Sequence, residues 1–308
     1  MRFDRGKITK AVVISAVFLA VLYWLADVDT ISFNQFDPWY LAGCVLLYIV
    51  MLNLRAVGFG LLASQQGKQV GFRKWLKLVA RHQLIFLIAP SGSGDLAFPH
   101  LARNITGIDI MTATNIIFRS RLRDICTILG LGVCGLVSTG IVPSFFIFFA
   151  IIAFIAMVWI EPASMLLSNG IKYGFPKLFA ENGWVDRFHA TSQIGFNQRA
   201  KISILTLAIW LVASAAIWVG FTAAGYQLNF DGAWVMIAGL NIAGALAISV
   251  AGFGVAEAGA TGVLMLLGET TGNAAAIAIV ARFGLLLSIV IAAVGLEAFT
   301  RLWLRFRN

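Results

Sequence analysis

Long runs of apolar residues, separated by short polar stretches, dominate the pattern of this chain. A helix rises 1.5 Å per residue, so about 20 apolar residues are needed to cross the hydrocarbon core of a bilayer. Six segments are long enough or nearly so, and we predict a membrane-spanning helix in each. They cover residues 9–26, 39–63, 115–138, 143–167, 202–225 and 274–300.

Three further apolar stretches are too short or too closely spaced to be ordinary spans. The stretch 76–89 has only 14 residues, and 234–251 is separated from 255–268 by three residues, Gly252 to Gly254. A connection that short leaves no room for a loop outside the membrane. We therefore predict two re-entrant helical hairpins, at 76–104 and 234–268, which enter the membrane and return to the same side.

Composition and charge exclude a soluble protein and set the topology. The chain is 60% hydrophobic and 12% charged, whereas soluble domains are about a quarter charged. Its net charge of +9 favours basic cytoplasmic helix ends over a nucleic-acid partner. With both termini cytoplasmic, the outer loops contain no Lys or Arg, and only Arg55 and Arg282 fall well inside spans. The basic start and apolar run 11–26 indicate a retained first span rather than a cleaved signal peptide. We expect an inner-membrane protein with anionic lipids at its cytoplasmic face.

The chain is expected to form a single membrane domain, residues 1–308, with two related halves. The first half covers about 1–142 and the second about 202–300, joined by the helix 143–167 and a cytoplasmic linker, 168–201. The linker mixes aromatic and charged residues, so it is either a helix lying on the membrane surface or a solvated loop.

The two predicted hairpins share a motif. Each tip carries Gly-x-Gly followed by an acid: Gly92, Gly94 and Asp95 in the first hairpin, and Gly252, Gly254 and Glu257 in the second. Arg121 follows Gly94 by 27 residues, and Arg282 follows Gly254 by 28. Because the hairpins enter from opposite sides, we predict an inverted repeat, which is a recurring design of secondary transporters. Non-helical tips at membrane depth must line a cavity, although small residues also serve simple helix packing.

Ionisable residues inside a membrane are costly and are usually functional. Glu257 and Arg282 lie in apolar sequence, so they should pair with each other or with an anionic ligand. Arg121 and Asp124 are one helical turn apart, so a local ion pair is equally consistent with the sequence. Four other positions have structural interpretations: Arg119 and Arg123 extend to the cytoplasmic interface, Glu161 is interfacial, and Arg55 contacts Asn53. We expect no cofactor and no metal site, and the three cysteines read as small apolar residues.

The same residues carry a resemblance to a known family. Pro90-x-Gly-x-Gly94-Asp95, Arg121-Leu-x-Asp124, Ala251-Gly-Phe-Gly-Val-x-Glu257 and Arg282 resemble the transmembrane region of lysylphosphatidylglycerol synthases, also called flippase-like membrane proteins. The resemblance covers about residues 10–300. Two positions depart from it, since the family usually has Glu at Asp95 and Gly at Ala251. Since the sequence ends at Asn308, we expect no soluble synthase domain of the kind that follows this region in the namesake enzymes.

The resemblance implies an all-α membrane protein that moves a charged lipid between leaflets without synthesising it. The expected substrate-binding residues are those of the two motifs: Gly92, Gly94, Asp95, Arg121, Asp124, Gly252, Gly254, Glu257 and Arg282. Two other classes stay open. One is a membrane-embedded enzyme, for which no catalytic constellation is visible, and the other is a non-catalytic subunit or scaffold of a lipid- or glycan-modifying enzyme. The expected partners are a membrane lipid as substrate, a second copy of the chain or a lipid-synthesising enzyme, and no nucleic acid.

Overall fold

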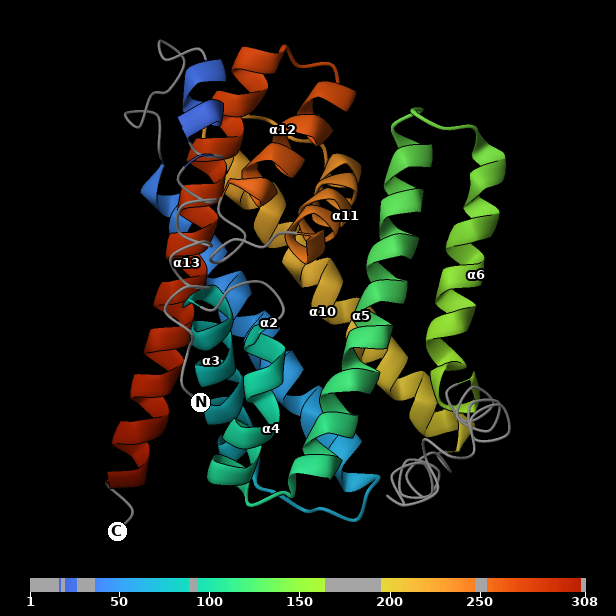
Figure 1. Cartoon of the computed structure of the whole chain (residues 1–308), viewed down its shortest axis with the longest axis vertical. Coiled ribbons are helices and arrows are strands. Elements are labelled where there is room, and N and C mark those ends of the chain that lie inside the picture. Colours follow the sequence, from blue (N-terminus) through green and yellow to red (C-terminus); the bar gives the residue numbers. More distant parts are fainter. Residues whose placement is uncertain are drawn as a thin grey trace.

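The computed structural model describes residues 17, 20–26, 37–88, 93–163, 195–246 and 254–305, and these residues form an all-helical protein (Figure 1). No strand occurs in these ranges. Three of their helices are long and apolar enough to cross a membrane: α2 (Pro38–Ser64), α10 (Phe196–Ala223) and the Thr271–Leu302 part of α13 (Thr271–Arg305). The protein is therefore an α-helical membrane protein, as its composition predicts.

The centre of the molecule is built by α2 and α10, which pack along each other and carry much of the buried apolar core. The helix α13 packs against α2 on one side, and α5 (Ile110–Ser138) packs against α10 on the other. Two cap residues explain where helices start. Asp37 accepts a hydrogen bond from Trp39 N at the start of α2, and Asp109 accepts one from Thr112 N at the start of α5.

Each segment predicted as a re-entrant hairpin forms a pair of packed helices, and its re-entry into the membrane stays a prediction. The first consists of α3 (Phe72–Ile88) and α4 (Ser93–Thr106), and the second of α11 (Phe230–Leu246) and α12 (Val255–Leu266). They lie toward opposite ends of the long axis of the molecule (Figure 1). Their tips, residues 89–92 and 247–253, fall outside the described ranges, so the prediction that the tips meet stays a prediction.

The predicted span 143–167 is interrupted in the structure, and its last four residues lie outside the described ranges. It begins with a 3₁₀ turn, η3 (Ser144–Phe146), and continues as α6 (Ile147–Val158), which ends at a bend at Trp159 before residues 160–163 become helical again. The helix α5 begins at Ile110, five residues before the predicted 115, because Asp109 caps it there. Most of the first span and of the linker 168–201 lies outside the described residues.

Candidate functional site

A double salt bridge joins the first hairpin to the helix that follows it. Arg121 of α5 donates from Nε to Asp95 Oδ2 at 2.7 Å and from Nη2 to Asp95 Oδ1 at 2.6 Å. This parallel, two-bond arrangement is the strongest geometry available to an arginine and a carboxylate. Both side chains keep somewhat more than a quarter of their surface exposed, so the pair can be reached from outside the core.

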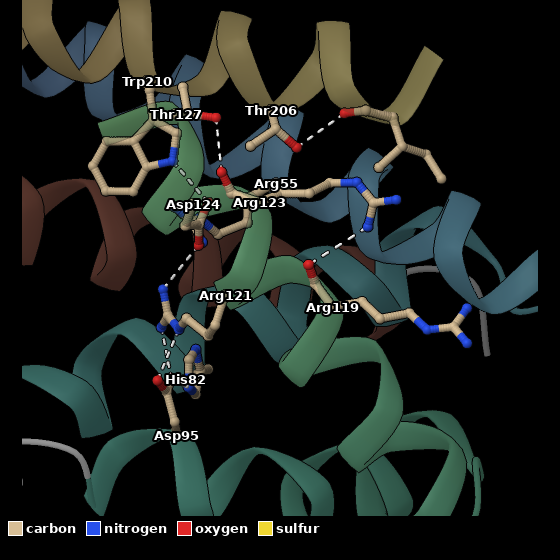
Figure 2. Close-up of polar contacts among 11 residues, drawn as sticks. Arg55, His82, Asp95, Arg119, Arg121, Arg123, Asp124, Thr127, Thr206 and Trp210 are labelled. Atoms are coloured by element: carbon tan, nitrogen blue, oxygen red, sulfur yellow. Dashed lines mark hydrogen bonds and ion pairs between the residues drawn. The ribbon is translucent and has the colours of Figure 1, made fainter. Parts of the chain in front are cut away.

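Asp124 forms the buried end of the same network (Figure 2). Its Oδ2 accepts from Arg121 Nη1 and from Arg55 Nη1, both at 3.1 Å, and its Oδ1 accepts from Trp210 Nε1 at 2.7 Å. Four helices, α2, α4, α5 and α10, therefore contribute side chains to one network. Two arginines face two aspartates, so the network has no net charge, which makes its partial burial tolerable.

Aromatic rings and a histidine enclose the exposed end of the network. The guanidinium of Arg121 lies 5.6 Å from the centre of the Phe86 ring, and His82 Nε2 lies 3.3 Å from Asp95 Oδ1. His82 is buried and packs edge-on against Phe98 at 5.2 Å. The α3 side of the site thus presents an apolar surface against which the Arg121–Asp95 pair is held.

Gly94 and Pro99 fix the backbone around Asp95. A Cβ on Gly94 would lie 2.8 Å from Phe86 Cδ2 and 2.9 Å from Phe86 Cα, so only glycine lets α4 approach α3 this closely. Pro99 lies inside α4 and has no N–H to give to the carbonyl oxygen of Asp95 four residues earlier. The acid therefore stands at a close helix contact with a backbone acceptor that the helix itself does not satisfy.

The second hairpin repeats the arrangement in a looser form. Glu257, in the first turn of α12, accepts a hydrogen bond through Oε2 from Gly254 N at 2.6 Å, and its Oε1 lies 3.7 Å from Nε of Arg282 on α13. Gly254 has a φ of +83°, a conformation that glycine adopts at no steric cost. The prediction that Glu257 and Arg282 are close is confirmed.

The two acid–arginine pairs are equivalent in sequence and in position. Asp95 precedes Arg121 by 26 residues, and Glu257 precedes Arg282 by 25 (282 minus 257). In each case the acid lies in the first turn of the second hairpin helix and the arginine lies on the next helix. Gly92 and Gly252, the other two predicted site glycines, lie outside the described residues.

A second charged cluster corrects three of the interpretations made from sequence. Arg119, Arg123 and Glu161 are each fully buried, and Arg123 of α5 donates to Glu161 in the helical residues 160–163 that follow α6. The two arginines do not extend to the interface with water, and Glu161 is not interfacial. Sequence position suggested otherwise because these residues lie near the ends of apolar runs, whereas tertiary packing of α6 against α5 covers them (Figure 2 shows the two arginines).

The predicted contact between Arg55 and Asn53 is also wrong. Arg55 donates to Asp124, while Asn53 Nδ2 donates to the carbonyl oxygen of Ile49 on its own helix. Arg55 therefore belongs to the charged network, and its place inside an apolar span was the signal that could have found it. Trp210 and His82 gave no such signal, because their types are common at helix interfaces.

Comparison with known families decides the identity of the chain. The model of the family described as the lysylphosphatidylglycerol synthase TM region matches residues 8–295. The chain belongs to this family. The match confirms the resemblance noted from the sequence motifs and identifies a membrane protein tied to lipid handling. Neither the curated proteins nor the solved structures include a significant match to the chain.

Members of this family are thus related to the membrane part of a lipid-modifying enzyme, and the charged network lies in the matched region. Within the described ranges, no group of three or more His, Cys, Asp or Glu side chains is placed to hold a metal ion. The network can form reversible ion pairs. Its arginines can bind a phosphate, and its carboxylates can bind a cationic group.

Proposed function

We propose that this member of the lysylphosphatidylglycerol synthase TM-region family moves a charged lipid between the two leaflets of the inner membrane. The substrate class is a phospholipid, an aminoacylated phospholipid or a lipid-linked glycan. The proposal includes six spans and two re-entrant hairpins arranged as an inverted repeat, with both termini cytoplasmic. The site residues are the two acid–arginine pairs, Asp124 and the tip glycines.

The observation that carries the proposal is the repetition of the acid–arginine pair. Each hairpin delivers a carboxylate to an arginine of the next helix, and the hairpins lie toward opposite ends of the molecule (Figure 1). Charges placed this way in an apolar protein are costly, and helix packing alone does not require them. A headgroup that enters from either leaflet would meet the same pair of charges, which is what movement between leaflets requires.

Arg121 is the group best suited to hold a lipid phosphate. Its partner Asp95 is partly exposed, and its other partner, Asp124, is buried. A phosphate can replace Asp95 at the planar guanidinium, since both offer two oxygens to the same two donors. Asp124 and Arg55 meanwhile hold Arg121 in position.

Replacement of Asp95 by a lipid phosphate at Arg121 also explains why the acids are present. An arginine that lost its carboxylate without gaining a phosphate would be left with an uncompensated charge, which is strongly unfavourable in a buried site. When a phosphate binds Arg121, Asp95 becomes free to bind a cationic group on the same lipid. One charge of each sign at each hairpin therefore suits a zwitterionic or aminoacylated headgroup.

The experiment is reconstitution of the purified protein in liposomes that contain fluorescently labelled lipids, with chemical bleaching of the outer leaflet. We expect lipid movement above empty liposomes without ATP, because the sequence has no nucleotide-binding motif. Asp95→Asn and Glu257→Gln should each reduce the initial rate at least tenfold while the protein stays folded. Glu269→Gln is the matched control, because Gln still accepts the hydrogen bond that Asn273 donates to Glu269, and its rate should match the wild type.

The outcome against the proposal is equally concrete. A panel of labelled phospholipids and lipid-linked sugars that shows no movement above empty liposomes would favour a non-catalytic subunit of a lipid-modifying enzyme. Full activity in both carboxylate variants would remove the charged pairs from the transport path.

A further inference from the structure

A second feature lies on the other side of the molecule, between α6 and α10. There the surface is hollowed into an apolar groove with a volume of about 390 Å³. The lining residues come from both helices: Ile151, Phe154, Ile155, Val158, Trp159 and Phe196. More than half of the surface of Ile155, Trp159 and Phe196 is exposed, so the groove opens outward.

The walls of this groove are fixed by contacts within the protein. Ser203 of α10 donates to the carbonyl oxygen of Met157 on α6 at 3.3 Å, and the hydroxyl of Thr127 on α5 lies 2.9 Å from the Met157 sulfur. Phe154 packs on Gly130 of α5, where an added Cβ would come within 2.8 Å of its ring. The groove is therefore set by packed helices rather than by loose side chains.

One end of the groove is basic. The guanidinium of Arg199, in the first turn of α10, lies 5.5 Å from the centre of the Trp159 ring. Its Nε and Nη1 atoms are buried and have no hydrogen-bond partner among the residues that the structure describes. Lys201 is exposed two residues further on, and Glu161, the acid nearest to Trp159 in sequence, is fully buried and bonded to Arg123.

Arginine donors left unbonded are unfavourable, so an acceptor that binds beside the Arg199 guanidinium would be favoured. Nε and Nη1 point to different sides of the guanidinium, so a phosphate is expected here as the counter-charge of Arg199 and of the nearby exposed Lys201 rather than as a ligand of both donors in parallel. The adjoining apolar groove suits an acyl chain, and tryptophan beside arginine is typical of the boundary between hydrocarbon and headgroups. The apolar groove therefore suits the acyl chain of an anionic lipid, and the basic end beside it suits the headgroup.

We propose that the α6–α10 groove binds one anionic phospholipid, with an acyl chain along Phe154 and Ile155 and its phosphate against Arg199. This site is separate from the Asp95–Arg121 pair, which α4 and α5 form on the side of α3. The bound lipid would cover the seam where α6 meets α10 and act as a structural or regulatory ligand. The inference does not depend on lipid transport and holds if the protein moves no lipid.

The test measures quenching of Trp159 fluorescence by brominated lipids in liposomes. The chain has nine tryptophans, so the signal of Trp159 is obtained as the difference between the wild type and Trp159→Phe. Phosphatidic acid and phosphatidylcholine with the same brominated chains are compared. We expect phosphatidic acid to quench Trp159 at a several-fold lower mole fraction, and Arg199→Gln to abolish this preference.

Two controls separate a site from general attraction to a basic surface. Arg301→Gln removes one exposed charge elsewhere and should keep the preference, since its side chain is 63% exposed on α13. Trp39, which is 84% exposed on α2, should show equal quenching by the two lipids. Equal quenching of Trp159 by both lipids, or a preference that survives Arg199→Gln, would overturn the proposal. Absence of Trp159 quenching by either lipid would also overturn it, because protein would then fill the groove.

Discussion

Asp124 is the residue on which the charge balance of the first site depends. It accepts hydrogen bonds from three side chains on three helices, and only 3% of its surface is exposed. Arg55 is buried as well, and its ion-pair partner among the residues that the structure describes is Asp124. Asp95 pairs with Arg121 but does not pair with Arg55, so it cannot take over this role. Asp124 is therefore expected to stabilise the fold more than any single contact at the exposed end.

We predict that Asp124→Asn lowers the free energy of unfolding by about 3–5 kcal/mol, the usual cost of breaking a buried ion pair. The amide can still accept from Trp210, but it leaves the charge of Arg55 uncompensated. Unfolding in detergent micelles, followed by circular dichroism, measures the change. Asp109→Asn is the control, because Asn caps a helix as well as Asp does and this position is exposed. Equal stability of the two variants would show that the buried pair contributes little.

At this scale the sequence singled out charged residues in apolar segments better than it predicted how they pair. Asp95, Arg121, Glu257 and Arg282 stood out because a charge in apolar sequence is costly unless it has a partner. The partners of Arg55 and Glu161 could not be predicted, because each is supplied by a helix 38 or more residues away. Hydrophobic pattern contains no information on which faces of distant helices meet.

The two hairpins are the elements that place these residues. Each is a pair of short helices whose close approach depends on glycine. In the first hairpin Gly94 packs on Phe86, and in the second a Cβ on Gly259 would lie 2.6 Å from the Cβ of Ala243. The pairing of these short helices was predictable, since an apolar helix too short to cross a membrane is expected to turn back; their re-entry into the membrane stays a prediction. The bend at Trp159 was less predictable, because backbone geometry there depends on packing.

We predict that Gly94→Ala and Gly259→Ala each destabilise the protein by about 1–3 kcal/mol, because neighbouring atoms must move to admit the new methyl group. Gly262→Ala is the matched control on α12. A Cβ there meets nothing within 4 Å, so alanine should be neutral or stabilise the helix by up to about 1 kcal/mol. Midpoints of thermal unfolding in the same detergent test the difference. Three equal midpoints would mean that the hairpins tolerate wider spacing than the structure shows.

For the molecule as a whole, the central claim is that the two hairpins serve one lipid path. The all-helical membrane fold follows from composition and apolar run length, and the family match over residues 8–295 agrees with it. The six-span count, the cytoplasmic termini and the meeting of the tips remain predictions. They depend on the tips and on the linker, which apolar run length alone does not place.

A double-mutant cycle on the rate of lipid movement tests this claim most directly. Asp95→Glu and Glu257→Asp keep both charges but change their reach, so each should slow movement without abolishing it. If both acids contact the same headgroup, the double variant should depart at least tenfold from the product of the two single effects, which corresponds to about 1.4 kcal/mol of coupling. A double variant whose rate equals that product within about twofold, the limit expected for independent sites, would contradict a shared path.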